Sequence, residues 1–263
     1  MTSPHERQWW SGRITQQALP ATSPRVTSIV HQSASGSCAF LAEATDGHHY
    51  WVKARGNPQG DQTLLTEYVC SKVGQLISAE VVSSRLVQLP EEFDNRNFQD
   101  PQGHLMRSGP AYGSLHIRYA WEGYESFREA APRETLPGLF AMWDLLLGND
   151  EQWLWAPFDQ RTVLSFDHSL WLDRGESDWD SHILKRLVDQ PWPMDPQPDY
   201  LHPESAQPIA DNLWHLGSGQ ILDLLCSVPL EWNVMVEELE TLGWFLYRRK
   251  DGTARRLEEL ADG

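Results

Sequence analysis

Apolar and polar residues alternate with a period of two in four stretches before residue 90, at 26–31, 38–43, 49–53 and 81–89. This alternation is typical of β-strands that bury one face. Small-residue connections separate the first three stretches, and Asp46-Gly47 is a turn signal. We therefore expect an antiparallel meander of three strands, followed by a further strand.

Apolar residues recur every three or four positions in the stretch 61–77, which predicts an amphipathic helix. A second helix is predicted at 134–147, with Gly148 as its C-terminal stop. The later part of the chain predicts three more helices, around 178–188, 209–226 and 230–260.

Two segments are rich in turn-forming residues. Residues 108–114 read Ser-Gly-Pro-Ala-Tyr-Gly-Ser and predict a turn cluster ahead of an extended run at 115–119, where the chain would cross between two lobes. Repeated prolines predict an extended loop at 191–208. Strands with one helix, followed by helices, indicate an α+β chain long enough for one large domain or two closely packed lobes.

Composition narrows the possible partners. The formal net charge is −16, from 21 basic and 37 acidic side chains, and we expect no nucleic-acid partner because backbone binding needs clustered cations. Three widely spaced cysteines indicate neither a disulfide framework nor a zinc site. No stretch approaches the ~20 apolar residues that cross a bilayer, and no signal peptide is visible, so we expect a cytoplasmic protein with no membrane partner. The 13 tryptophans suit core packing, with a carbohydrate platform as the alternative.

Two aspartates flank a short predicted hairpin. A polar loop after the helix at 134–147 presents Asp150, and the apolar strand at 163–166 delivers Asp167. In kinase-like sites one carboxylate orients or deprotonates the attacking hydroxyl, and another holds the magnesium that neutralises the phosphates. Loop aspartates also cap helices and make turns, so the pair alone leaves both interpretations open.

Three features of the first part would complete such a site. Ser35, Gly36 and Ser37 form a small-residue turn whose backbone N–H groups could approach phosphates. Lys53 follows on a strand, where its ammonium could pair with phosphate oxygens, and Glu67 on the predicted helix could hold it. From these residues alone, a plain hairpin, an exposed strand lysine and a solvated helix glutamate are the alternatives.

Taken in order, these residues resemble the HipA-like kinase family, in the bacterial branch with a Val-Lys-x-x-Gly-Asn-Pro-Gln-Gly signature. Val52-Lys53 is followed by Gly-Asn-Pro-Gln-Gly at 56–60. Tyr112-Gly113-Ser114 is similar to that branch's aromatic-Gly-Ser segment. Gly148-Asn149-Asp150 is similar to its catalytic loop, and Phe166-Asp167-His168 to its metal-binding Asp-His-Gly.

The resemblance covers roughly residues 26–174 and implies a two-lobed protein-kinase-like fold. Its lobes would be a small antiparallel-sheet N-lobe at 25–109 and a mainly helical C-lobe with the catalytic loop at 110–263. Prolines among Ser, Thr and Gln separately predict a flexible N-terminal arm at 1–24, which could pack through Trp9 and Trp10. The implied activity is ATP- and Mg²⁺-dependent transfer of phosphate to a Ser or Thr hydroxyl of a protein.

The resemblance also implies residue roles. Asp150 would be the catalytic aspartate and Asp167 a metal ligand. Lys53 would hold the α- and β-phosphates, and Glu67 would fix Lys53. The turn at Ser35, Gly36 and Ser37 would cover the nucleotide.

The chain departs from the family's pattern at the metal site. The family's loop continues from Asp through Arg to a metal-binding Asn five residues after the Asp, whereas Glu151 and Trp155 stand at these positions here. An indole offers only an N–H donor and cannot coordinate magnesium. Ser169 also replaces the Gly that normally follows Asp-His. Another oxygen would have to complete the metal sphere, from Asn149, Gln152 or Asp159.

Three functions remain open on this basis. The first is a HipA-like kinase that phosphorylates Ser or Thr of a protein. The second is a catalytically weakened pseudokinase that acts as a nucleotide- or protein-binding regulatory module, which Trp155 favours. The third is a small-molecule kinase, since antibiotic-phosphorylating enzymes share this broad architecture.

Overall fold

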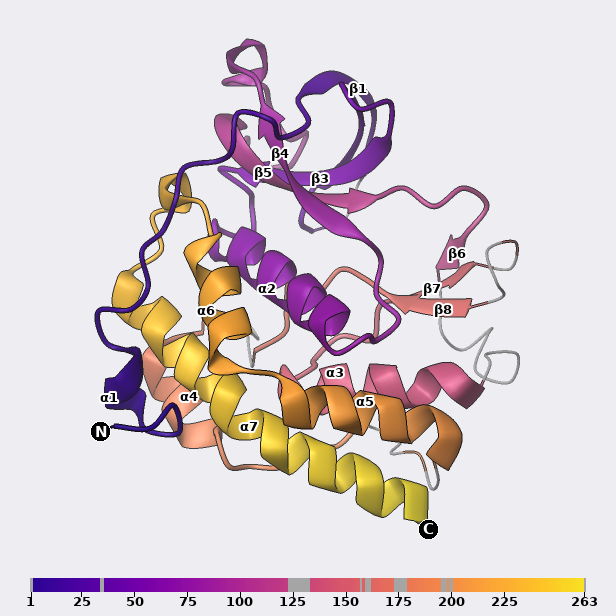
Figure 1. The fold of residues 1–263 in the computed structure, drawn as a ribbon. Helices are drawn as coiled ribbons and strands as arrows, with labels where there is room; N and C mark the ends of the chain where they lie inside the picture. Colours follow the sequence, from indigo (N-terminus) through magenta and orange to yellow (C-terminus); the bar gives the residue numbers. More distant parts are fainter. Residues whose placement is uncertain are drawn as a thin grey trace.

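An antiparallel sheet forms the upper part of the molecule (Figure 1). The computed structural model describes residues 2–33, 36–122, 133–156, 158, 162–172, 179–194, 198 and 201–262. Five strands lie in the order β1-β2-β3-β5-β4, namely β1 Val26–Gln32, β2 Phe40–Ala44, β3 His49–Arg55, β5 Arg107–Leu115 and β4 Ser84–Leu89. The first three strands form the expected meander, and β4 is the expected further strand.

Strand β5 corrects the prediction of a turn cluster at 108–114. It lies between β3 and β4 and pairs antiparallel with both. Pro110 falls where the β3–β5 register shifts, which is where a sheet tolerates a residue without an N–H. Gly113 lies against β4, since a Cβ there would stand 3.0 Å from Val87 Cγ1. Pairing on both sides therefore overrides the local turn preference, and the extended run expected at 115–119 ends at Leu115.

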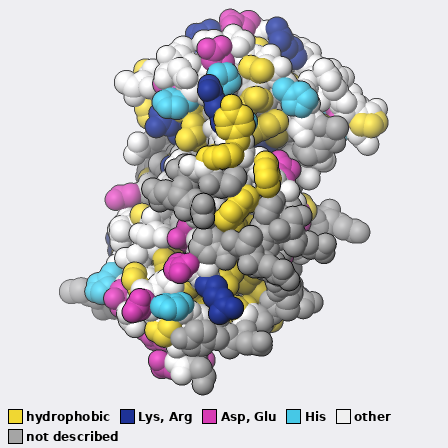
Figure 2. Space-filling view, turned by 90° about the vertical axis from the view of Figure 1, so that its right-hand side faces the viewer, with side chains coloured by type: hydrophobic (Ala, Val, Ile, Leu, Met, Phe, Trp, Pro, Cys, Tyr) yellow, Lys and Arg dark blue, Asp and Glu magenta, His cyan; other side chains and the backbone are white. Residues whose placement is uncertain are grey.

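A second, smaller sheet lies beside the first, between it and the helices (Figure 1). Its antiparallel order is β6-β7-β8, with β6 Trp121–Glu122, β7 Trp153–Ala156 and β8 Thr162–Ser165. Figure 2 views the molecule from this side, where hydrophobic side chains gather on the upper half and middle of the face. Trp121 and Phe158 are exposed by 56% and 80%, so this region carries aromatic side chains open to solvent.

Helices form the lower part of the molecule, and α2 (Gln62–Leu76) lies between them and the upper sheet (Figure 1). The lower helices are α3 Leu136–Leu145, α4 Ser181–Leu187, α5 Pro203–His215, α6 Ser218–Cys226 and α7 Val236–Asp262. Short 3₁₀ helices lie at Glu91–Phe93, Arg133–Thr135 and Leu230–Trp232.

Several predicted boundaries in this part are wrong. The extended loop expected at 191–208 stops where α5 begins at Pro203, because proline suits a first helical turn whose N–H groups have no helical acceptor. The single helix expected at 209–226 is two helices that separate at Gly217. The last helix begins at Val236, after a 3₁₀ turn, rather than near residue 230.

Buried apolar side chains form two clusters. The upper cluster lies in the five-stranded sheet and includes Phe40, Val52 and Val87. The larger cluster fills the helical part, and it includes Leu64 and Val73 of α2. Helix α2 thus belongs to the first part of the chain but contributes its buried side chains to the core of the second.

The N-terminal arm packs against the helical part. Its short helix α1, Arg7–Trp10, contacts α7, and Trp10 is fully buried. Trp10 lies against Gly243, where a Cβ would collide with the indole. This end of the arm is therefore packed, because a large aromatic ring gains more by burial than a polar segment does. Within the described ranges, no helix has an apolar stretch long enough to cross a membrane.

Candidate active site

Lys53, Glu67 and Asp167 meet between the upper sheet and the helices. The Lys53 ammonium donates to Glu67 Oε1 and lies 2.5 Å from Asp167 Oδ1. Strand β3 supplies the lysine, α2 supplies the glutamate, and the turn after β8 supplies the aspartate. Lys53 and Glu67 are buried, whereas Asp167 is partly exposed. Three segments distant in sequence thus converge on one ammonium group.

The backbone at Asp167 directs two groups toward this cluster. Asp167 has a φ of 50°, a left-handed conformation that Asp tolerates better than most residues. The chain turns so that the next N–H, of His168, donates to Glu67 Oε2 at 3.0 Å. Ser169 donates its hydroxyl to Asp167 Oδ1 at 3.0 Å. Glu67 is therefore held from both sides, by an ammonium on one oxygen and by a backbone N–H on the other.

The ionisation of the cluster follows from this geometry. Burial by itself lowers the pKa of Lys53, but the carboxylates of Asp167 and Glu67 outweigh it and raise that pKa above its usual range. Burial likewise opposes ionisation of Glu67, yet Lys53 and His168 hold the pKa of that carboxyl well below its usual range. Near neutral pH the lysine is therefore cationic and the glutamate anionic.

A cavity of about 420 Å³ opens beside this cluster. Lys53, Glu67 and Asp167 form its polar end. Residues 114–117, at the end of β5 and just beyond it, form another wall. The apolar lining comes from both sheets and from residues next to the ends of their strands, and it includes Ala39, Val82, Leu115, Leu154 and Phe166. Cavities of this size, with apolar walls and a few convergent charges, are typical of cofactor sites.

Asp150 lies on the loop between α3 and β7. Its Oδ2 accepts a hydrogen bond from Gln152 Nε2 at 2.8 Å, and its backbone carbonyl accepts one from Trp171 Nε1 at 3.1 Å. Gln152 lines the cavity, whereas Asp150 is set back beside it. The structure thus brings Lys53, Glu67 and Asp167 together, whereas Asp150 does not line their cavity and is hydrogen-bonded to Gln152, which does.

The end of α3 differs in detail from the prediction that Gly148 is its stop. Leu147, not Gly148, adopts the left-handed conformation, with a φ of 50°. The Gly148 N–H then donates to the Trp143 carbonyl at 2.8 Å, which is the closing bond of a Schellman motif. Glycine is required at 148 for space, because a Cβ there would overlap the Trp143 indole.

A buried charge network fixes the base of this loop. Asp144 in α3 accepts from Arg256 Nη2 at 2.6 Å and from the Trp192 N–H at 2.9 Å. The Trp192 indole in turn donates to the Gly148 carbonyl at 2.6 Å. Arg249, buried in α7, donates to the carbonyls of Leu187 and Gln190 at 2.7 and 2.6 Å. The network links α7 and the 187–192 segment to the loop that carries Asp150.

Arg249 of this network is not a solvent-exposed cation at a helix end. Arg249 lies within a helix that continues to Asp262 and is only 2% exposed. The sequence offers a partial signal, since Arg249 follows Phe245 and Leu246 at helical spacing and thus shares their buried face. Its partners, mainly backbone carbonyls far along the chain, leave no sequence pattern.

The turn expected to cover a nucleotide is described only in part. Ser35 lies outside the described residues, Gly36 is exposed and Ser37 is buried. The Ser37 carbonyl accepts from Asn57 Nδ2 at 2.7 Å. Asn57, which has only 4% of its surface exposed, thus joins the 56–60 segment to the β1–β2 turn. It was not among the predicted site residues.

The candidate metal-binding positions separate in the structure. Asn149 is exposed on the loop, and Asp159 lies outside the described residues. Trp155 lies within β7, paired with Trp121 of β6 and Val163 of β8. Of the described positions in this group, only Gln152 lines the cavity together with Asp167. An amide oxygen beside a carboxylate fits the all-oxygen coordination that Mg²⁺ prefers.

The two lobes, with a lysine held by a helix glutamate beside an aspartate in the intervening cavity, define a protein-kinase-like molecule. The model of the HipA-like kinase family matches residues 26–240, so the chain belongs to that family. The prediction of the family and that of the two-lobed α+β fold are therefore confirmed.

Among solved structures, the chain is similar to a proinflammatory kinase of Helicobacter pylori, CtkA. The identity is 11%, the match covers 93% of this chain and 100% of that chain, and the TM-score is 0.57, which shows a shared fold. The Golgi casein kinase with Mn and ADP bound has 9% identity, 96% and 75% coverage, and a TM-score of 0.45. No curated protein matches the chain.

Proposed function

We propose that this HipA-like kinase uses ATP and Mg²⁺ to phosphorylate a Ser or Thr hydroxyl of a protein. The observation that carries the proposal is the contact of the Lys53 ammonium with both Glu67 and Asp167 at the end of a 420 Å³ cavity. A kinase site needs a lysine for phosphate oxygens, a glutamate that fixes the lysine and an aspartate for the metal.

The surroundings of each residue support the role that we propose for it. Lys53 presents a permanent positive charge to phosphate oxygens, and Glu67 prevents it from turning away. Asp167, with Gln152 nearby, would hold Mg²⁺, which neutralises phosphate charge when bound. Asn149 remains a candidate for an additional metal contact, although it does not line the cavity.

Asp150 is proposed to orient or deprotonate the acceptor hydroxyl. Its carboxylate accepts a hydrogen bond from Gln152, which lines the cavity together with Asp167. The Ser35–Ser37 turn is proposed to cover the phosphates, with Asn57 holding its second half in place.

Nucleotide binding can be tested by thermal unfolding with and without ATP and Mg²⁺. The parent should be stabilised, and Lys53→Ala and Asp167→Asn should lose the effect. Lys185→Ala is a matched control, because it removes an exposed lysine of α4. A parent that gains no stability from ATP and Mg²⁺ would contradict the proposal.

Phosphate transfer needs a separate measurement. Labelled γ-phosphate should appear on Ser or Thr of protein, and Asp150→Asn should reduce the rate about 10²–10⁴-fold. Label on an aminoglycoside, with none on protein, would instead support the small-molecule kinase.

A regulatory module that binds nucleotide without transferring phosphate is the second candidate. Trp155 favours it, because this side chain belongs to β7 and offers no oxygen to a metal. Nucleotide-dependent stabilisation that survives Asp150→Asn, together with no transfer to any acceptor, would select this candidate.

A further inference from the structure

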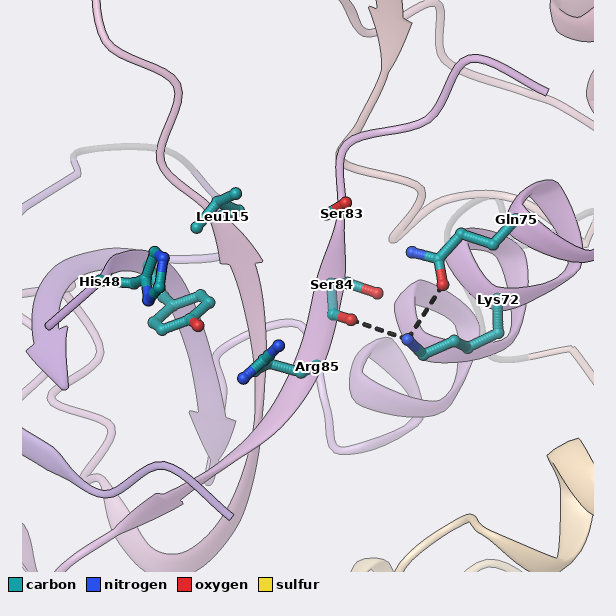
Figure 3. Close-up of a pocket in the computed structure, with 8 residues that line it drawn as sticks. His48, Lys72, Gln75, Ser83, Ser84, Arg85 and Leu115 are labelled. Carbon is teal, nitrogen blue, oxygen red and sulfur yellow. Dashed lines mark hydrogen bonds between the residues drawn. The ribbon is translucent and has the colours of Figure 1, made fainter. Parts of the chain in front are cut away.

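A second cavity, of about 370 Å³, lies at the outer edge of the upper sheet. Lys72 of α2 and Arg85 of β4 enter it from two sides, and His48 lies beyond Arg85 (Figure 3). β4 is the edge strand of the five-stranded sheet. Tyr50 of β3 lines this cavity, whereas its neighbour Trp51 lines the first one. Because side chains alternate along a strand, the two cavities lie on opposite faces of β3.

Among the described residues, no carboxylate pairs with the Lys72 ammonium, which lies 5.9 Å from the centre of the Tyr68 ring. The ammonium is half-buried and donates to two neutral acceptors, Gln75 Oε1 at 3.1 Å and the Ser84 carbonyl at 2.7 Å (Figure 3). Burial and the repulsion from Arg85 lower the pKa of Lys72. A partly buried ammonium without a carboxylate partner is a costly arrangement that an anion would relieve.

The described residues that line the cavity include no Asp or Glu, in a chain whose net charge is −16. Asp46 is a carboxylate partner of two lining residues, since it accepts from Arg85 Nη1 at 3.3 Å and from the Tyr50 hydroxyl at 2.8 Å. His48 Nδ1 also lies 3.6 Å from Asp46. Asp46 does not line the cavity. Asp46 thus contacts Arg85 and His48, whereas the Lys72 hydrogen bonds go to the Gln75 amide and the Ser84 carbonyl.

Arg85 is exposed enough to contact a ligand. More than half of its side-chain surface is exposed, 55%, and its contact with Asp46 uses one terminal nitrogen at a long distance. A guanidinium presents several donors in a planar fork that matches phosphate and carboxylate oxygens. The remaining donors can thus engage an anion while the contact with Asp46 persists.

We propose that this cavity binds a phosphoryl group, with Lys72 and Arg85 as its charged donors and His48 as a further donor. A doubly charged phosphate matches the two permanent cations, and the cavity has room for the group that carries it. The source is either inorganic phosphate or the phosphorylated side chain of a protein, since both present the same oxygens. The proposal does not depend on the function of the first cavity.

The experiment uses the full chain and measures thermal unfolding with increasing inorganic phosphate, at an ionic strength held constant with chloride. Phosphate should raise the unfolding temperature of the parent in a saturable way. Lys72→Met and Arg85→Gln should each weaken the apparent affinity about tenfold or more. Arg85→Gln changes an exposed side chain, so it tests the site even if Lys72→Met unfolds.

Two controls locate the effect. Lys53→Met should keep the phosphate response, because Lys53 lies in the other cavity, and Lys185→Met should keep it as well. A response lost in Lys53→Met but retained in Arg85→Gln would assign phosphate to the first cavity and overturn the proposal. A parent that gains no stability from phosphate would overturn it too.

The two sources are distinguished by a second titration with O-phosphoserine. Binding at least as tight as that of inorganic phosphate, with the same dependence on Lys72 and Arg85, supports a phosphorylated side chain as the ligand. Binding of inorganic phosphate alone supports the free anion.

Discussion

Lys53 and Asp167 form a 2.5 Å ion pair across 114 residues of sequence. The pair joins the central region of the upper sheet to the end of the second sheet. Glu67 then ties the same ammonium to α2. One side chain thus fixes the relative positions of three structural elements around the cavity.

Replacement of Lys53 by Met should destabilise the fold. Glu67 is completely buried. Without the lysine, its carboxylate keeps the contact with His168 but loses its ammonium partner. We expect a loss of about 3 kcal/mol in the free energy of unfolding, measured with urea at pH 7. Lys185→Met should change it by less than about 0.5 kcal/mol.

The buried glutamate should also shape stability at acid pH. Because its pKa in the folded protein lies below the ordinary value of 4.5, Glu67 contributes stability above pH 4.5 that is lost as pH falls toward the folded pKa. The stability difference between the parent and Glu67→Gln should therefore narrow below pH 4.5, by up to about 1.4 kcal/mol per pH unit. The pH range from about 3 to 7 spans the ordinary pKa of Glu. If the stability difference between the parent and Glu67→Gln stays constant over this range, the carboxylate is not stabilised by neighbouring charges.

Arg249 and its neighbour Arg248 offer a matched pair in α7. Arg249 is buried and donates to three backbone carbonyls, whereas Arg248 is exposed and contacts Asp189 at 3.2 Å. Arg249→Met should cost about 3 kcal/mol, because several buried carbonyls lose their donor. Arg248→Met should cost less than about 1 kcal/mol. Equal effects in urea unfolding would refute a special role for the buried network.

Gly148 and Gly219 provide a second matched pair. A Cβ at 148 would overlap the Trp143 ring, whereas one at 219 in α6 meets nothing within 4 Å. Gly148→Ala should destabilise by about 1–3 kcal/mol and disturb the Asp150 loop. Gly219→Ala should be neutral or stabilising by up to about 1 kcal/mol. Circular dichroism melting curves can measure both.

Trp155→Asn restores the residue type that the family pattern has, but the structure argues against a gain of function. Trp155 lies in β7, where it pairs with β6 and β8, and its side chain is partly buried against the larger hydrophobic cluster. The substitution should cost about 2 kcal/mol without raising phosphate transfer. Gln152→Leu should instead weaken the Mg²⁺ dependence of transfer. Increased transfer in Trp155→Asn would show that residue 155 reaches the metal.

The sequence allowed the family and most strands and helices to be predicted, because periodic patterns report which face is buried. It also singled out Lys53, Glu67 and Asp167, which the structure brings into contact. Their roles still await the measurements above. The ordered features along the chain carried this prediction, since no single residue among them is distinctive.

What the sequence could not reveal depends on contacts between distant segments. The sequence of β5 predicts a turn because Gly, Pro and Ser make up five of its nine residues, and only pairing with β3 and β4 makes it a strand. Leu147 adopts the left-handed conformation that glycine usually has at the end of a helix. Gly148 is needed instead because a side chain there would overlap the Trp143 indole. The Lys72 cavity likewise arises only when α2 and β4 are placed together.

Helix α2 reaches both functional regions while its apolar side chains stay in the lower core. If the upper sheet were to pivot over the helices, α2 would remain with the body beneath, and the salt link from Lys53 would stretch before the helix itself moved. Because its buried side chains pack in the lower core and Glu67 pairs with Lys53, α2 couples the position of the upper sheet to the helical body.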